Sequence, residues 1–115
     1  MISGERRVVI TGLGLMVANG VGREQAWKNL LDGVNGIAPT TRCDVSDLTS
    51  QVSGEVPEFD LFTYLDKKEA RRMDRFTHLA IAAAGEAIDH SGLDIAKESE
   101  LIGCMIGVGI GGMET

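Results

Sequence analysis

Glycine is concentrated near one end of the 115-residue sequence. Four of the six residues at 107–112 are Gly, and positions 107, 109 and 112 match the GxGxxG spacing that can cradle a pyrophosphate. That fingerprint also needs a helix opening at the last Gly and an acidic residue about 20 positions later, before which this sequence ends. We therefore expect the 107–112 backbone to pass close to another element or a ligand, and we expect no nucleotide cofactor. Gly12 and Gly14, with Val17 where a third Gly would stand, indicate a tight turn after a strand.

Basic side chains cluster at 67–72, which hold four of the eleven Lys and Arg residues of a chain with net charge −6. In a helix capped by Asp66, the side chains of Lys68, Arg71 and Arg72 share one face because they follow i, i+3, i+4 spacing. Two interpretations stay open. In the first, the face is solvated and its charges pair with nearby carboxylates. In the second, it docks an acidic partner, and its positive charge accelerates their association. The nearby carboxylates are those of Asp66, Glu69 and Asp74.

The thiols and imidazoles form no recognisable reactive group. Cys43 and Cys104 belong to no CxxC pair, and neither has a His at the spacing of an activated thiol or a zinc site. His78 and His90 are 12 residues apart, which places them about 120° apart around a helix. We therefore predict no catalytic residue and no metal site here, and two reduced thiols in a cytoplasmic protein.

Composition excludes several classes of protein. Apolar residues make up 43% and charged residues 24% of the chain, which is typical of one globular domain and not of a disordered tail. A net charge of −6 with five aromatic residues argues against general nucleic-acid binding. The apolar run after Arg6 and Arg7 is too short for a signal peptide, and no apolar run is long enough to span a membrane.

Hydrophobic periodicity predicts the order strand, helix, irregular excursion, helix, strand. Continuous apolar runs predict strands at 8–11 and 101–108 that are buried on both faces. Helical spacing predicts helices at 24–32 and 67–90, ended by Gly33 and Gly92, and a short strand is expected at 51–56 within the excursion at 34–62. This order is typical of an α/β layer with a parallel sheet. Since so few elements cannot cover such a sheet, we expect residues 1–115 to be the N-terminal piece of a larger domain.

Several ordered motifs together resemble the start of the elongating β-ketoacyl-acyl carrier protein synthases of the KAS II type. The motifs are residues 6–14, Trp27, 30–33, 36–37, 66–76 and 107–112. The resemblance runs from Arg6 to Thr115 and covers roughly the first quarter of a family member. It departs at 16–20, where the family has a Ser/Thr-Pro-hydrophobic-Gly turn and this sequence reads Met-Val-Ala-Asn-Gly.

The resemblance implies a thiolase-type fold, in which two similar α/β halves pack as α-β-α-β-α layers and two chains form a homodimer. It also implies an acyltransferase of fatty acid biosynthesis. A Cys thiolate carries an acyl group, malonyl-acyl carrier protein loses CO₂, and the resulting carbanion attacks the thioester. The family's catalytic Cys, His pair, Lys and Phe lie beyond position 115. Residues 1–115, as an N-terminal fragment of the first half, are therefore expected to be inactive alone.

Two features of the family carry over to this sequence. Ile110, between Gly109 and Gly111, matches the isoleucine that gates the acyl-chain pocket, and the glycines then leave room for an acyl chain to slide past. The basic face described above matches positions that dock the acidic helix of acyl carrier protein. On the resemblance, the docking interpretation of 67–72 is preferred.

Three alternatives stay open. A ketosynthase or a non-catalytic chain-length partner of a type II polyketide system would share the fold, although residues 67–76 favour the fatty acid type. A non-catalytic module that only binds acyl carrier protein is the second. A nucleotide-binding half-domain is the third.

Overall fold

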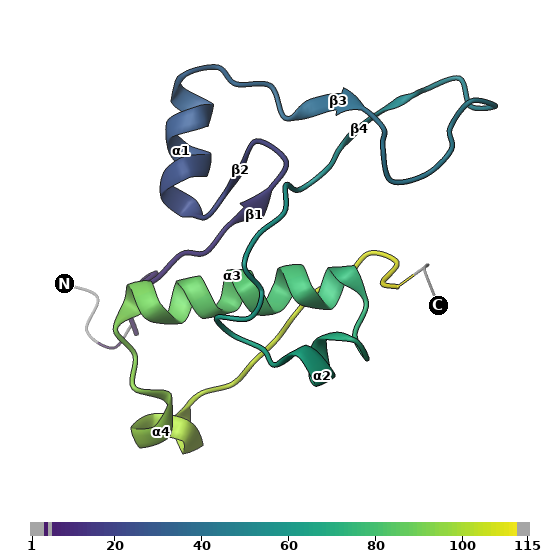
Figure 1. Cartoon of the computed structure of the whole chain (residues 1–115). Helices are drawn as coiled ribbons and strands as arrows, with labels where there is room; N and C mark the ends of the chain where they lie inside the picture. Colours follow the sequence, from purple (N-terminus) through teal and green to yellow (C-terminus); the bar gives the residue numbers. More distant parts are fainter. Residues whose placement is uncertain (1–3, 5, 113–115) are drawn as a thin grey trace.

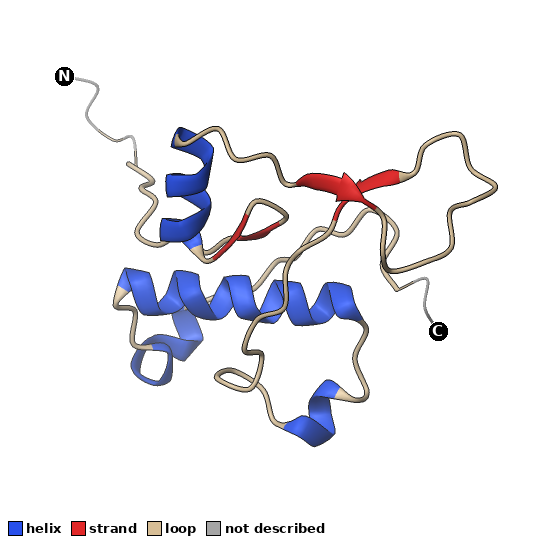
Figure 2. Cartoon of the chain, turned by 45° about the horizontal axis from the view of Figure 1, so that its top comes forward, coloured by secondary structure: helices blue, strands red, loops and turns tan. Residues whose placement is uncertain are grey.

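The computed structural model describes residue 4 and residues 6–112 of the chain. Its longest element is helix α3 (Arg75–Ser91), which runs through the middle of a molecule measuring 59 × 38 × 24 Å (Figure 1). Figure 2 shows α3 between the small strand pairs and the two short helices. The other elements are β1 (Met16–Val17), β2 (Gly20–Val21), α1 (Arg23–Leu31), β3 (Ile37–Pro39), β4 (Val52–Gly54), α2 (Lys67–Ala70), α4 (Ile95–Glu98) and the 3-10 turn η1 (Ser99–Leu101).

Two extended segments lie directly on α3. Residues 12–14 approach the backbone of its C-terminal half, because Gly12 and Gly14 carry no side chain. A Cβ on Gly12 would collide with the carbonyl oxygen of Ala87, and one on Gly14 with that of Ala83. These two glycines therefore permit close approach to a helix, which differs from the tight turn expected from the sequence. The second segment, residues 104–108, lies along the N-terminal half of α3.

Glu86 of α3 holds the N-terminal hairpin and α1 in place. Its Oε2 accepts a hydrogen bond from the backbone N–H of Leu15 at 2.9 Å, and its Oε1 accepts one from the N–H of Arg23 at 2.8 Å. The Arg23 guanidinium lies 3.6 Å from the same Oε1. Helix α1 begins after Gly22, which has no side chain to cap it. A carboxylate from another helix therefore satisfies the first N–H group of α1.

The stretch between α1 and α2 contains an antiparallel arm of two strands, with Ile37 opposite Gly54 (Figure 1). Glu55 follows β4 and accepts hydrogen bonds from the hydroxyl of Thr41 at 2.6 Å, from its N–H at 2.8 Å and from the N–H of Arg42 at 3.1 Å. These bonds, led by that from the Thr41 hydroxyl, lower the pKa of Glu55 from 4.5 to about 2. A charged Glu55 therefore ties the two sides of the arm together.

The strands expected at 8–11 and 101–108 do not form within the described residues. Both segments are without ladder partners, and the two sheets in the described part of the chain are antiparallel pairs of two strands. The exposed fraction is 94% for Val8 and 97% for Met105. A strand exists only where a neighbour completes its hydrogen bonds, and residues 6–112 contain no such neighbour for these two segments. The parallel sheet that the order of elements predicts is likewise not formed among these residues.

Most of the predicted helices, short strands and helix ends are confirmed, but one predicted helix is divided in two. The helix at 24–32 is confirmed as α1, and the strand at 51–56 as the shorter β4. Gly33 and Gly92 follow α1 and α3 with left-handed φ values of 70° and 68°, as predicted. The helix expected at 67–90 is two helices, because residues 71–74 turn and α3 begins anew after Asp74. The hairpin of β1 and β2, which turns at 18–19, was not predicted from the sequence.

Within the described residues, none of the helices combines the length and the apolar character that a membrane crossing requires.

Candidate functional site

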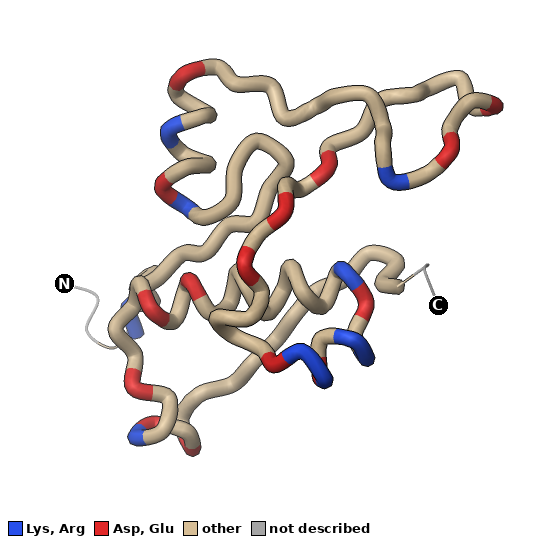
Figure 3. The backbone as a smooth tube through the Cα atoms, in the orientation of Figure 1, with Lys and Arg blue, Asp and Glu red and all other residues tan. Residues whose placement is uncertain are grey.

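A basic patch, defined here as Lys68, Arg71 and Arg72, lies on α2 and the turn after it: Lys68 is in the helix, Arg71 is its C-cap residue, and Arg72 follows. Asp66 caps the helix as predicted, because its Oδ1 accepts hydrogen bonds from the N–H groups of Lys68 at 2.8 Å and Glu69 at 2.9 Å. All three basic side chains are exposed. Figure 3 shows the basic residues gathered on and around α2. Three exposed cations therefore lie within five residues of the chain, on α2 and the turn that follows it.

Local carboxylates do not neutralise the basic patch. Within residues 6–112, none of the ion pairs includes any of its three members. Asp66 uses Oδ1 for the cap, and neighbouring Lys67 lies over the ring of Phe62, 5.5 Å from its centroid. The local pairing that the sequence left open is not realised in the structure. Within residues 6–112 the three cations of the patch are therefore exposed and without an ion pair.

The patch is anchored to α3 through the C-terminal end of α2. Ala70 is buried, with 8% of its surface exposed. Its carbonyl oxygen lies 2.9 Å from Nε2 of His78 on α3, so the imidazole donates there when Nε2 carries the proton. This contact fixes the direction of the short helix. The basic patch is therefore joined to α3 by this contact and by the burial of Ala70.

The glycine-rich turn rests on the N-terminal end of α3, immediately beyond α2. Gly111 has a φ of 84°, and a Cβ built on it would lie 3.8 Å from Cζ of Phe76. A Cβ on Gly112 would overlap the carboxylate of Asp74. Ile110 is 82% exposed, and nothing lies within 4 Å of a Cβ built on Gly109. The three predicted substrate residues thus lie together, with the Ile110 side chain open to solvent.

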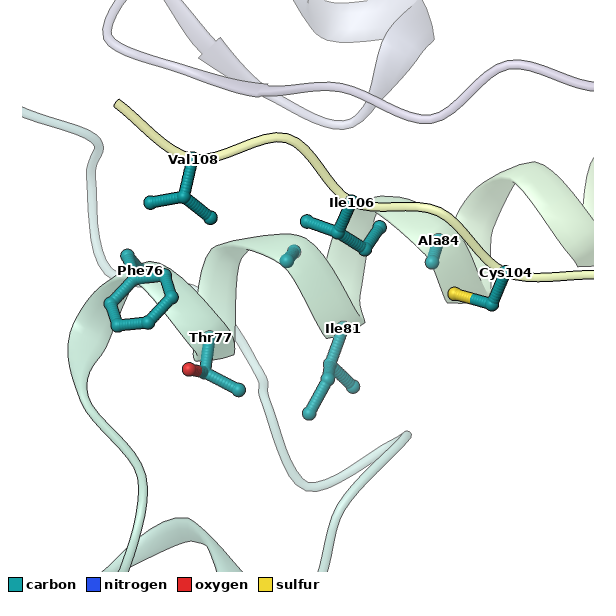
Figure 4. Close-up of a pocket in the computed structure, with 8 residues that line it drawn as sticks. Phe76, Thr77, Ile81, Ala84, Cys104, Ile106 and Val108 are labelled. Carbon is teal, nitrogen blue, oxygen red and sulfur yellow. The ribbon is translucent and has the colours of Figure 1, made fainter. Parts of the chain in front are cut away.

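An apolar groove of about 300 Å³ separates α3 from the extended segment above it. Figure 4 shows Phe76 and Ile81 on the helix, with Ile106 and Val108 on the segment that crosses it. The remaining lining residues are Thr77, Ala80, Ala84 and Cys104. Such a lining can cover hydrocarbon, but it brings no acid or base pair to a substrate.

The two His side chains make hydrogen bonds to the backbone of other segments, and the two Cys side chains are free. Nδ1 of His90 accepts a hydrogen bond from the N–H of Leu13 at 3.0 Å, which helps to hold the 12–14 segment on α3. His78 supports α2 as described above. Cys43 and Cys104 are free and exposed, the first in the 34–62 excursion and the second on the groove.

Two residues that matter for this arrangement were not recognised from the sequence as site residues. Asp74 and Phe76 support the glycine-rich turn, yet the expected continuous helix at 67–90 placed both inside its first turns. The signal was the Asp before a fresh helical run, since Asp is a preferred N-cap residue. Reading Asp74 as a cap would have separated α2 from α3.

Comparison with known proteins places this chain. Residues 5–115 match the family model described as beta-ketoacyl synthase, N-terminal domain. The chain is 48% identical over 115 residues to 3-oxoacyl-[acyl-carrier-protein] synthase 2 of Staphylococcus aureus (strain COL), covering 99% of this chain and 28% of the relative. It is 45% identical over 111 residues to the protein of the same name from Synechocystis sp., covering 96% of this chain and 27% of that protein.

Structural comparison gives the same result. The ishigamide ketosynthase/chain length factor superposes with a TM-score of 0.72 and 33% identity, covering 81% of this chain and 23% of that one. The chain thus spans about a quarter of the length of the relatives that it matches. Its α/β fold is part of the thiolase-like fold of ketosynthases. The chain belongs to the β-ketoacyl synthase family and matches its N-terminal domain.

Proposed function

We propose that the protein containing this chain is a 3-oxoacyl-[acyl-carrier-protein] synthase of fatty acid elongation. The observation that carries the proposal is the 48% identity to curated synthases across 99% of the chain. The proposed reaction is a decarboxylating Claisen condensation. Malonyl-acyl carrier protein loses CO₂, and its carbanion attacks an acyl group held as a thioester on the enzyme, extending the chain by two carbons.

We propose that residues 1–115 form the N-terminal part of the first thiolase-like half and carry recognition rather than bond-making. A thiol that holds the acyl group needs a neighbouring base that deprotonates it. Among the described residues neither thiol has this setting, because Cys43 lies in the excursion and Cys104 lines an apolar groove. The catalytic Cys and His residues are supplied by other parts of the protein. The active protein is proposed to be a cytoplasmic homodimer, and residues 1–115 alone are proposed to be inactive.

The basic patch is the proposed docking surface for acyl carrier protein. Its three cations are exposed and free of ion pairs within residues 6–112, and Ala70 and His78 fix the helix that carries them. A cationic surface of this kind attracts an acidic carrier and accelerates encounter. The turn at 109–112, beyond the same end of α3, is the proposed contact for the acyl chain, with Ile110 as its gate.

The experiment uses the whole protein with acyl- and malonyl-acyl carrier protein, and product formation is followed by mass spectrometry. Lys68, Arg71 and Arg72 are replaced together by Ala. At about 0.5 kcal/mol for each exposed charge pair, the loss is about 1.5 kcal/mol, or roughly tenfold in kcat/KM. The loss is expected mainly in KM and to shrink as salt is added.

Two controls separate docking from general damage. Lys97→Ala removes an exposed cation on α4 and is expected to leave kcat/KM unchanged. Acyl-pantetheine, which lacks the carrier, should react equally well with the wild type and the triple variant. An unchanged KM for the carrier-bound substrate in the triple variant would contradict the docking surface. Carrier binding without any condensation by the wild type would instead support a non-catalytic binding module.

A polyketide ketosynthase or chain-length partner is the second candidate. The observation that favours it is the superposition on the ishigamide ketosynthase/chain length factor at a TM-score of 0.72. The higher identity, 45–49%, is to proteins named 3-oxoacyl-[acyl-carrier-protein] synthase 2, which is why that function is preferred. A protein that condenses only when mixed with a different ketosynthase subunit would support the second candidate.

A further inference from the structure

Three helices begin at an Asp, and one of these three residues behaves differently. Asp66 and Asp94 each accept hydrogen bonds from N–H groups in the first turn of their helix. Asp74 has the same extended backbone geometry as Asp66, with φ −74° and ψ 161°, but its side chain makes no capping bond to α3. The carboxylate best placed to cap the longest helix is therefore turned elsewhere.

The side chain of Asp74 lies against the glycine-rich turn. A Cβ on Gly112 would lie 2.5 Å from Cγ of Asp74 and would overlap its Oδ2. The missing side chain of Gly112 is thus the space that the Asp74 carboxylate occupies. Phe76 makes the neighbouring contact, beside Gly111. Asp74, at the N-cap position, and Phe76, in the first turn of α3, thus lie against two consecutive glycines of the turn, Gly112 and Gly111.

The position of Asp74 joins the turn to the basic patch. Asp74 follows Arg72 by two residues, in the tight link between α2 and α3 where the N–H of Met73 bonds to the carbonyl of Ala70 at 3.2 Å. The direction of the Asp74 side chain is therefore set by the same backbone that presents the patch. The side chain of Ile110 itself is 82% exposed.

We propose that Asp74 is a positioning residue that seats the 109–112 turn and thereby sets the place of Ile110. Its carboxylate makes no capping hydrogen bond to α3 and instead fills the space beside Gly112, where a side chain would otherwise lie. The effect on acyl-chain selection rests on the proposed function, because it takes Ile110 as the gate. The seating of the turn is a property of the fold and does not depend on that function.

The test compares Asp74→Ser with the wild type in the whole protein. Ser is a good N-cap residue, so α3 keeps its start, but its shorter side chain does not reach Gly112. Hydrogen exchange of the 107–112 peptide, followed by mass spectrometry, is expected to become about tenfold faster. Asp74→Asn keeps the size of the side chain without its charge. Because the proposed seating is by packing, exchange in this variant should stay as slow as in the wild type. Asp94→Ser is the matched control, because it makes the same substitution at the N-cap of α4. It should leave exchange of the 107–112 peptide unchanged.

The second readout is chain-length selection. The ratio of kcat/KM for long against short acyl-carrier substrates is expected to shift about fivefold in Asp74→Ser, with KM for malonyl-carrier unchanged. A folded Asp74→Ser protein with wild-type exchange in 107–112 would overturn the proposal, and so would a wild-type chain-length ratio in an active enzyme. A wild type that never condenses, but whose turn loosens in Asp74→Ser, would refute the proposed function and leave the seating of the turn supported.

Discussion

Replacing Glu86 by Ala should loosen the attachment of the N-terminal hairpin and α1 to α3. Glu86 accepts hydrogen bonds from the N–H groups of Leu15 and Arg23, and it pairs with the Arg23 guanidinium. Its side chain is only 17% exposed, so water does not fully replace these bonds. The variant leaves the first turn of α1 without its cap, since Gly22 cannot supply one.

The expected loss can be worked out from these contacts. The partly buried bond to the Arg23 N–H is worth about 1.5 kcal/mol, and the exposed bond to the Leu15 N–H about 0.5–1 kcal/mol. The partly exposed ion pair adds about 0.5 kcal/mol. The sum of about 2.5–3 kcal/mol corresponds to exchange of these two amides that is roughly 60- to 150-fold faster.

The assay is hydrogen exchange of the Leu15 and Arg23 amides in the whole protein, resolved by NMR or by overlapping peptides. Glu24→Ala is the matched control, because Glu24 also pairs with Arg23, at 3.1 Å, but its side chain is 84% exposed. That variant should change exchange by less than about threefold. Equal effects of Glu86→Ala and Glu24→Ala would refute the reasoning that partial burial and backbone donors make Glu86 the stronger support.

Two further predictions concern the arm and the helix contact. Because hydrogen bonds from Thr41 lower the pKa of Glu55 from 4.5 to about 2, its stabilising effect is complete above pH 4.5 and is lost as the pH falls towards 2. Glu55→Gln should therefore flatten the acid limb of the unfolding curve in this window, and an unchanged limb would contradict the bonds. Gly14→Ala should cost about 1–3 kcal/mol in urea unfolding, because its Cβ would collide with the carbonyl of Ala83. Gly103→Ala, with open space around its Cβ, is the control and should be near neutral.

Local signals in the sequence predicted the helices and their ends well. Asp66 as a cap and Gly33 and Gly92 as terminators act within one turn of the chain, so their effect does not depend on distant residues. The continuous helix at 67–90 was wrong for a related reason. Apolar spacing continues smoothly through residues 73–76, and only the Asp at 74 signals that a second helix begins there.

The segments predicted as strands, 8–11 and 101–108, show where the local sequence was not enough. Their apolar, β-branched composition describes residues that favour a sheet, but pairing needs a neighbour at hydrogen-bonding distance, and residues 6–112 provide none. The role of Glu86 was equally hidden, because Leu15 and Arg23 are 71 and 63 residues away in the sequence. No periodicity or spacing connects a carboxylate to backbone donors so far along the chain.

For the candidate site, residue types and their spacing determined the chemistry: a one-turn cationic face at 68–72 and a turn at 107–112 with glycines around Ile110. Both properties are encoded within a few residues, and together with the motifs at 6–14, Trp27, 30–33 and 36–37 they carried the resemblance to the family. Only the tertiary structure decided that the cations stay unpaired within residues 6–112 and that Asp74 turns from its own helix to Gly112. These outcomes depend on which surfaces meet when α3 packs against distant segments, because side-chain partners are chosen by proximity in space and not by order along the chain.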